Sequence, residues 1–177
     1  MKAATKVNDN ALKILERRYF LKDEDGNLLE DAEGMFRRVA HTMSQAEYKY
    51  GATDEEVSQW EYKFFDLMWN LDFVPNSPTL MNAGTGEGTM SACYVMDIPD
   101  SMKDIMRVAG DQAMIEKYGG GIGFSLSALR PKGHSITTTQ GKACGPIHVL
   151  KVLSQVGTMI TQGGKRDGAH MAIMEVY

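Results

Sequence analysis

Cysteine is scarce in this chain of 177 residues, which contains only Cys93 and Cys144. Two cysteines cannot form the disulfide framework of a small secreted domain, and this number fits a reducing compartment. No apolar run approaches the length needed to cross a membrane, and residues 1–9 lack the apolar core of a signal peptide. We therefore expect a cytoplasmic protein without a membrane partner.

The chain also lacks an excess of positive charge. Its 19 Lys and Arg residues are outnumbered by 23 Asp and Glu residues, which gives a net charge of −4. A nucleic-acid-binding protein would be expected to carry a basic stripe, so we expect no nucleic-acid partner. Any phosphate site must be local, built from backbone N–H groups and a few cations. The four histidines show no metal-ligand spacing, and we predict no metal site.

Residues 1–75 have the apolar periodicity of amphipathic helices. We expect a helix over 11–19 with Asp9 or Asn10 as its cap, a second helix capped by Asp31, and a third opened by a capping box at 53–56. A turn at Asp25-Gly26 would join two short strands between the first two helices. The Met, Trp and Phe stripes of these helices are typical of core residues. We therefore expect no chemistry in this segment.

From residue 76 onward, the sequence predicts loops alternating with short strands and helices. We expect strands at 93–96, 122–126 and 171–177, and helices at 101–118 and 146–162, the second of them stopped by Gly163-Gly164. Helical crossovers between apolar strands indicate an α/β sheet, so we divide the chain into a helical segment, 1–75, and an α/β segment, 76–177. Three strands would leave an open edge and an uncovered face, and we expect the chain to be a fragment of a longer protein.

Two glycine-containing segments carry the strongest chemical signal. The first, NSPTLMNAGTGEGTMSAC (76–93), delivers a cysteine to the head of the first strand, and the second, GGGIGFSLSALRPKG (119–133), places three glycines before the next. Exposed backbone N–H groups and a thiol favour an anionic substrate and redox chemistry. On spacing alone, the alternative of an ordinary loop with a structural cysteine stays open, because free cysteines are often small core residues.

Together with TQGGKRDGAHM (161–171), these segments resemble, in their order, the catalytic subunit of ribonucleotide reductase. They look most like the adenosylcobalamin-dependent class II enzymes. The resemblance implies a ten-stranded α/β barrel, of which this chain would supply the N-terminal helices and the first strands. It also implies the reduction of ribonucleotides, preferentially diphosphates, with adenosylcobalamin as cofactor and an external dithiol as reductant. The C-terminal remainder of the enzyme would be a necessary partner.

The resemblance assigns redox chemistry to Cys93, beside the ribose C2′ position. There, a thiyl radical on another cysteine abstracts the 3′ hydrogen, the 2′ hydroxyl leaves as water, and two thiols close to a disulfide. Because that radical cysteine and the redox partner would lie downstream, we expect the chain alone to be inactive. We interpret Cys144 as structural, although a disulfide with Cys93 stays open. The other substrate-binding residues that the resemblance implies are Ser77, Pro78, Ala92, Gly120, Gly121 and Arg166.

The resemblance further implies a site for a deoxynucleoside triphosphate effector at a homodimer contact formed by helices 101–118 and 146–162. Residues 163–170 resemble the loop that relays effector identity to the substrate base, but Asp167 and His170 depart from its usual pattern. The implied effector-binding residues are Asp100, Ser101, Met102, Arg130 and Lys132.

Two other interpretations stay open. The chain could be a non-catalytic nucleotide-binding or assembly module that needs a second polypeptide, or a structural domain with vestigial motifs. For Arg130 and Arg166, the alternative to a nucleotide contact is an exposed, solvated charge.

Overall fold

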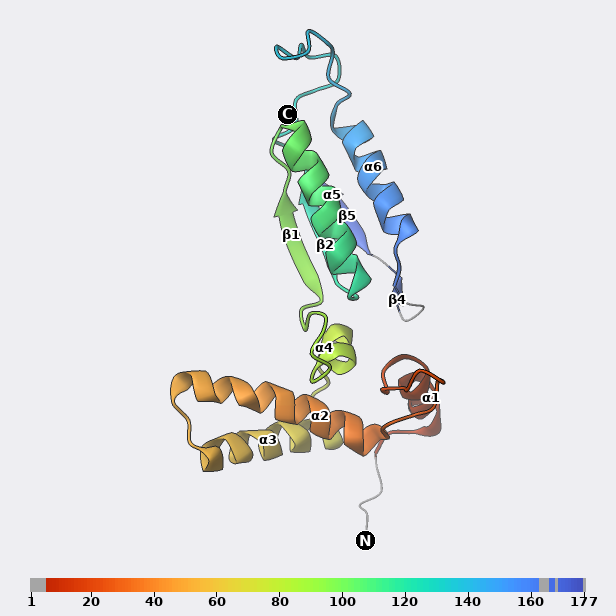
Figure 1. Cartoon of the computed structure of the whole chain (residues 1–177), viewed down its shortest axis with the longest axis vertical. Helices are drawn as coiled ribbons and strands as arrows, with labels where there is room; N and C mark the ends of the chain where they lie inside the picture. Colours follow the sequence, from red (N-terminus) through yellow and green to blue (C-terminus); the bar gives the residue numbers. More distant parts are fainter. Residues whose placement is uncertain (1–5, 163–165, 168, 177) are drawn as a thin grey trace. The chain divides into compact units, whose positions relative to one another are not determined.

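The computed structural model describes residues 6–162, 166–167 and 169–176, without the side chains of 161–162 and 166–167. The contacts divide the chain into two compact units, Met1–Ser91 and Ala92–Tyr177. The sequence predicted the change at residues 75/76. No described helix is long and apolar enough to cross a membrane. The helices of the first unit, labelled in Figure 1 where there is room, are α1 (Asp9–Arg18), α2 (Ala32–Ser44), η1 (Gln45–Tyr50), α3 (Asp54–Trp69) and α4 (Ser77–Asn82).

Helices α2 and α3 of the unit Met1–Ser91 begin where the sequence predicted. The Asp31 side chain accepts a hydrogen bond from Gly34 N, and Thr53 and Glu56 form the predicted capping box at the start of α3. The first helix differs, because its cap is Asn8 rather than Asp9 or Asn10. The predicted strand pair is reduced to a single antiparallel bridge on either side of the Asp25-Gly26 turn.

The apolar faces of these helices meet in one core. Its buried residues are Val7, Phe20, Ala32, Met35, Phe36, Val39, Ala40, Met68, Leu80 and Ala83. The stripe predicted for α3 is only partly buried: Val57 and Met68 are buried, whereas Trp60, Leu67 and Leu71 are exposed.

Helix α4 was not predicted, since the sequence was interpreted as a loop from Asn76 to Cys93. Asn76 begins it, and its Oδ1 accepts hydrogen bonds from Thr79 N and Thr79 Oγ1, both at 3.0 Å. Pro78 fits the first turn, where no N–H is needed for the helix. With six residues, the helix is too short to show a periodic apolar pattern.

The unit Ala92–Tyr177 contains the predicted parallel sheet. Strands β1 (Cys93–Asp97), β2 (Gly121–Ser125) and β5 (His170–Ile173) lie in the order β1-β2-β5, with α5 (Met102–Lys117) and α6 (Pro146–Met159) as the crossover helices (Figure 1). Both pairings are parallel, with Cys93 opposite Gly121 and Ile122 opposite His170. The predicted α/β class is confirmed. In the described residues the sheet has three strands, with β1 and β5 as its open edges.

The helices cover one face of this sheet. Its core residues are Ile98, Val108, Ala109, Ile122, Phe124, Leu126, Leu129, Val149 and Leu153. The opposite face is exposed in the described part of the chain: Val95 is 82% exposed, and Cys93, Met171 and Ile173 are also exposed.

Several predicted boundaries and one predicted face in this unit are wrong. Helix α6 ends at Met159, so it does not reach 162; β3 (Thr161–Gln162) follows and pairs antiparallel with β4 (Arg166–Asp167). The predicted stop at Gly163-Gly164 lies outside the described residues. Strand β2 begins one residue early, and β5 begins at His170 and ends at Ile173 instead of running to 177. On α5, Gln112 and Glu116 are buried, whereas Met102 and Met106, predicted for the apolar face, are exposed.

Candidate functional site

The candidate residues of this unit lie at two opposite edges of the parallel sheet. Cys93, Gly121 and His170 begin β1, β2 and β5, so they mark the amino edge. Asp100 and Arg130 follow the carboxyl ends of β1 and β2. A strand of five residues spans about 16 Å. The residues predicted to bind an effector and the predicted redox cysteine therefore lie at opposite ends of the same strands.

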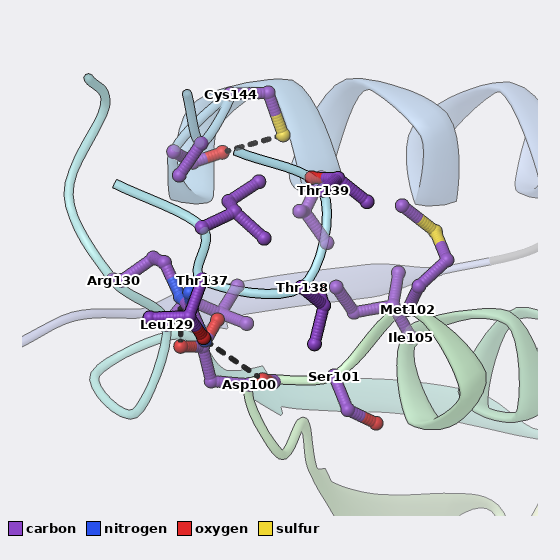
Figure 2. A pocket seen from close by; sticks show the side chains of 14 residues that line it. Asp100, Ser101, Met102, Ile105, Leu129, Arg130, Thr137, Thr138, Thr139 and Cys144 are labelled. Atoms are coloured by element: carbon purple, nitrogen blue, oxygen red, sulfur yellow. Dashed lines mark hydrogen bonds and ion pairs between the residues drawn. The ribbon is translucent and has the colours of Figure 1, made fainter. Parts of the chain in front are cut away.

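A cavity of about 490 Å³ opens at the carboxyl edge. Figure 2 shows that its walls come from three segments: the start of α5, residues 129–130 after β2, and the loop before α6. The lining is mixed, with apolar side chains beside three consecutive threonines. The lining residues are Asp100, Ser101, Met102, Ile105, Leu129, Arg130, Ile136, Thr137, Thr138, Thr139, Ala143, Cys144, Gly145 and Val149.

Arg130 and Asp100 form an ion pair in this cavity (Figure 2). Arg130 Nε donates to Asp100 Oδ2 at 2.5 Å, and Nη2 reaches the Asp100 backbone oxygen at 3.5 Å. Both side chains are about one-third exposed. The guanidinium therefore keeps access to solvent and could contact an anion while Asp100 holds its orientation.

The loop 130–145 closes the cavity and carries only basic charge. It folds back on itself: Gly133 N donates to Ala143 O at 2.9 Å, and Ala143 N donates to His134 O at 2.8 Å. Arg130, Lys132 and Lys142 lie in this loop, which contains no Asp or Glu. Among the lining residues of the cavity, however, the charged side chains are Arg130 and its ion-pair partner Asp100.

The other predicted effector residues have different surroundings. Met102 lines the cavity and is 72% exposed. The Ser101 hydroxyl is used within α5, because it accepts from Asp104 N at 3.1 Å and donates to Asp104 Oδ2. This hydrogen bond lowers the pKa of the Asp104 carboxyl, and the nearby Arg107 acts in the same direction. Lys132 does not line the cavity. Its backbone packs tightly against Gly145, because a Cβ at Gly145 would lie only 2.8 Å from Lys132 N.

The amino edge presents the Cys93 thiol. The cysteine is free and exposed, and it lies on the face of the sheet that the helices leave uncovered. Cys144 is also free and lines the carboxyl-edge cavity, so the two cysteines are not joined in this structure. The predicted neighbours of Cys93 are brought together with it, since Gly121 N donates to Ala92 O at 2.7 Å.

Two glycines beside Cys93 are required by close contacts. A Cβ at Gly120 would lie 2.7 Å from Ile115 Cγ2, and a Cβ at Gly121 would lie 3.1 Å from Ala169 O. The second contact joins β2 to β5, where Ile122 N donates to Ala169 O at 2.9 Å. Side chains are thus disfavoured at this edge, where the Gly120 N–H donates to Ile115 O at 3.1 Å and the Gly121 N–H donates to Ala92 O.

Ser77 and Pro78 belong to the other unit, within α4. Pro78 is fully buried, so it shapes the helix rather than presenting a side chain. The Ser77 hydroxyl lies 2.8 Å from the Tyr19 hydroxyl. Tyr19 was missed by the sequence analysis, because no local pattern connects residues 58 positions apart. The Arg166 side chain, predicted to contact substrate, lies outside the described residues.

A buried polar cluster under the amino edge was also missed. Glu116 is fully buried; its Oε1 accepts from Gln112 Nε2 at 3.0 Å and lies 3.6 Å from His170 Nδ1. Gln112 Nε2 also donates to Leu153 O at 2.9 Å, which joins α5 to α6. Gly157 makes room for the imidazole, because a Cβ there would lie 2.8 Å from His170 Cε1. His170 therefore lies within ion-pair distance of Glu116, although its Nδ1 makes no hydrogen bond.

Comparison with known protein families decides the affiliation. The family described as "Ribonucleotide reductase, all-alpha domain" matches residues 5–88, and "Ribonucleotide reductase, barrel domain" matches residues 91–177. The chain belongs to the ribonucleotide reductase large-subunit family. Its helical unit followed by parallel strands and crossover helices is the beginning of that subunit's fold.

Individual relatives agree with this assignment. A vitamin B12-dependent ribonucleoside-diphosphate reductase from Thermoplasma acidophilum is 38% identical over 96% of this chain and 29% of its own length. The Mycobacterium tuberculosis protein of the same name is 37% identical over 97% of this chain and 24% of its own length. Among solved structures, the Actinobacillus ureae class Id ribonucleotide reductase alpha subunit matches with a TM-score of 0.73 and 25% identity, over 95% of this chain and 28% of that one. The chain thus spans 24–29% of the length of these relatives.

Proposed function

We propose that this chain acts as the N-terminal part of an adenosylcobalamin-dependent ribonucleoside-diphosphate reductase of the cytoplasm. The support for diphosphate substrates and for cobalamin is the name of the two vitamin B12-dependent ribonucleoside-diphosphate reductases to which it is 37–38% identical. The observation that carries the proposal is the exposed Cys93 thiol at the head of β1, next to the glycine backbone of β2.

In this proposal, Cys93 supplies one of two reducing thiols. The C2′–O bond of the ribose breaks, a C2′–H bond forms, and the oxygen leaves as water. The two thiols lose two electrons and two protons in total and close to a disulfide, which an external dithiol then reduces. The second thiol and the radical cysteine would come from outside this chain. Ser77 would contact the diphosphate through its hydroxyl, and Ala92, Gly120 and Gly121 would contact the substrate through their backbone. Arg166 would face the base.

The cavity at the carboxyl edge would hold the deoxynucleoside triphosphate effector. The loop 130–145 supplies Arg130, whose planar guanidinium is suited to phosphate oxygens and is oriented by its ion pair with Asp100. The apolar start of α5 would contact the base or the sugar. Exposed residues of α5 and α6, among them Met106 and Val152, would form the homodimer contact beside this cavity.

The residues of this chain do not identify a cobalamin site. No group of three or more His, Cys, Asp or Glu side chains with metal-binding proximity exists among the described residues, and the large cavity lies at the edge opposite Cys93. We therefore assign the cofactor by family alone and derive no step through it.

A second function has its own support in the self-contained cavity. The chain could bind a nucleotide as a regulatory module and require another polypeptide for turnover. The two functions differ in whether Cys93 matters, since a binding module needs no thiol.

The test is nucleoside diphosphate reduction with adenosylcobalamin and dithiol. We expect no turnover by residues 1–177 alone, and turnover by the complete reductase polypeptide that carries them. Turnover by the 177-residue chain alone would contradict the proposed division of the active site. If the complete polypeptide is active and its Cys93→Ser variant keeps full activity, the result would favour the regulatory module.

A further inference from the structure

The helical unit contains one hydroxyl pair that connects a helix outside the proposed site to a residue within it. Tyr19 follows α1, and its hydroxyl lies 2.8 Å from the Ser77 hydroxyl at the start of α4. The sequence predicted no chemistry for residues 1–75. We infer that Tyr19 is a positioning residue, which orients the Ser77 hydroxyl toward a substrate phosphate. This inference rests on the proposed function of Ser77.

Tyr19 is itself held in place by the core. Tyr19 N donates to Leu15 O at 2.8 Å and closes α1, while the neighbouring Phe20 is 3% exposed. The Tyr19 ring packs partly buried against the helical core. A phenol fixed at its ring can offer its hydroxyl at one point in space with little remaining freedom, which lowers the entropy lost when the hydrogen bond forms.

Helix α4 is also fixed at its opposite end. Arg38 donates from Nη1 to Ala83 O at 2.5 Å and from Nη2 to Leu80 O at 3.1 Å. The same guanidinium is paired with Glu30 at 2.6 Å, and both side chains are largely buried. A buried ion pair therefore holds the end of α4 opposite Ser77, and the Asn76 cap holds the end where Ser77 lies.

The direction of the hydrogen bond decides what Ser77 can do. A serine hydroxyl has one proton, so a proton donated to Tyr19 is not available to a phosphate. If the Tyr19 phenol donates instead, the Ser77 proton points elsewhere and can be donated to a phosphate oxygen. A bound anion favours this second arrangement, because the two hydrogen bonds then polarise each other in series.

The test uses Tyr19→Phe in the complete reductase polypeptide, because this change removes one oxygen and keeps the ring in the core. We expect the KM for a nucleoside diphosphate to rise about tenfold, as for the loss of one hydrogen bond to a charged ligand. The kcat should change less than about twofold, because phosphate binding acts equally on substrate and transition state. Ser77→Ala should give a similar rise, and the double variant should be no worse than Ser77→Ala alone.

Tyr48→Phe is the matched control. The Tyr48 hydroxyl also donates one hydrogen bond within this unit, to Asp54 Oδ1 at 2.9 Å, but Tyr48 does not contact α4 through it. Its loss should leave the KM unchanged. Thermal unfolding of both Phe variants checks that the comparison is made on folded protein.

Failure of this inference and failure of the proposed function give different results. A raised KM for Ser77→Ala with an unchanged KM for Tyr19→Phe would overturn the role of Tyr19 alone. Additive losses in the double variant would also overturn it, because Tyr19 would then act independently of Ser77. An unchanged KM for Ser77→Ala would remove Ser77 from the substrate site and overturn both.

Discussion

The two edges of the parallel sheet differ in how much of a binding site the residues of this chain form. At the carboxyl edge, residues between Asp100 and Val149 enclose a cavity of about 490 Å³ with its own ion pair and basic loop. At the amino edge, Cys93 lies exposed on the uncovered face of the sheet. The remaining predicted substrate residues are shared between the two compact units.

This difference has a topological cause. The carboxyl-edge cavity is closed by a loop that folds back on itself within sixteen residues, 130–145, so it needs no distant sequence. A site at the amino edge is surrounded by the heads of successive strands, and each new strand requires a further crossover. We therefore expect nucleotide binding and turnover to be separable in this family member, with binding available to the chain alone.

The largest effect is expected at the amino edge. Cys93→Ser in the complete reductase polypeptide should reduce multiple-turnover activity by about 10³-fold or more, because a redox thiol cannot be replaced by a hydroxyl. Steady-state dithiol-dependent assays measure this loss. Substrate affinity, measured separately by equilibrium binding, should stay the same. Sustained turnover by the variant would remove the redox function from Cys93.

The next largest effect concerns the contribution of a buried and of an exposed ion pair to the stability of the helical unit. Arg38→Ala should lower the free energy of unfolding by about 3 kcal/mol, because it leaves the buried Glu30 carboxylate unpaired. Arg37→Ala is the control: its pair with Glu33 is exposed, and its loss should cost less than about 1 kcal/mol. Urea unfolding of the 177-residue chain measures both. Equal losses would show that α4 does not depend on the buried pair.

The proposed dimer contact gives a smaller, concentration-dependent effect. Met106→Asp places a charge on an exposed apolar position of α5 and should weaken association about tenfold. Ile14→Asp, at an exposed position of α1 in the other unit, is the control and should leave association unchanged. Sedimentation of the complete reductase polypeptide, with and without effector, measures this. Equal association of wild type and Met106→Asp would exclude this face of α5 from the contact.

The smallest effect concerns the cap of α5. The Ser101 hydroxyl holds the pKa of the Asp104 carboxyl below its ordinary value. Because the folded-state pKa is depressed, the associated stability is present above the unfolded pKa and is lost as the pH falls through the folded one. Ser101→Ala should raise this pKa toward its ordinary value, as followed by NMR of the carboxyl group.

Glu56 is the internal reference for that titration. Its pKa is lowered by the Thr53 backbone and hydroxyl in the capping box of α3. The Ser101 variant should therefore leave Glu56 unchanged. A shift of both groups would indicate a global change rather than the loss of one hydrogen bond.

Sequence patterns predicted the elements better than the contacts between them. The caps at Asp31, Thr53 and Ser101 follow from local side-chain chemistry, and the structure contains all three. The parallel pairing followed from the helical crossovers. Helix α4 was missed because six residues are too few for a periodic signal.

The candidate site was predictable only through its motifs. Asp100 and Arg130 were named from the family resemblance, and the structure brings them into one ion pair. Tyr19 and Glu116 were not named, because their roles arise from partners 58 and 54 positions away in the chain. Such pairs leave no local pattern and become visible only when the chain is folded.

The central claim is that the carboxyl-edge cavity of this chain binds a deoxynucleoside triphosphate. Isothermal titration of the 177-residue chain with dATP and dTTP tests it directly. We predict saturable binding that Arg130→Ala weakens at least about tenfold, because a charge-assisted hydrogen bond to phosphate is lost. Arg107→Ala removes the same charge from a surface pair on α5 and should have little effect. The absence of saturable binding, or equal affinity in wild type and Arg130→Ala, would contradict the account.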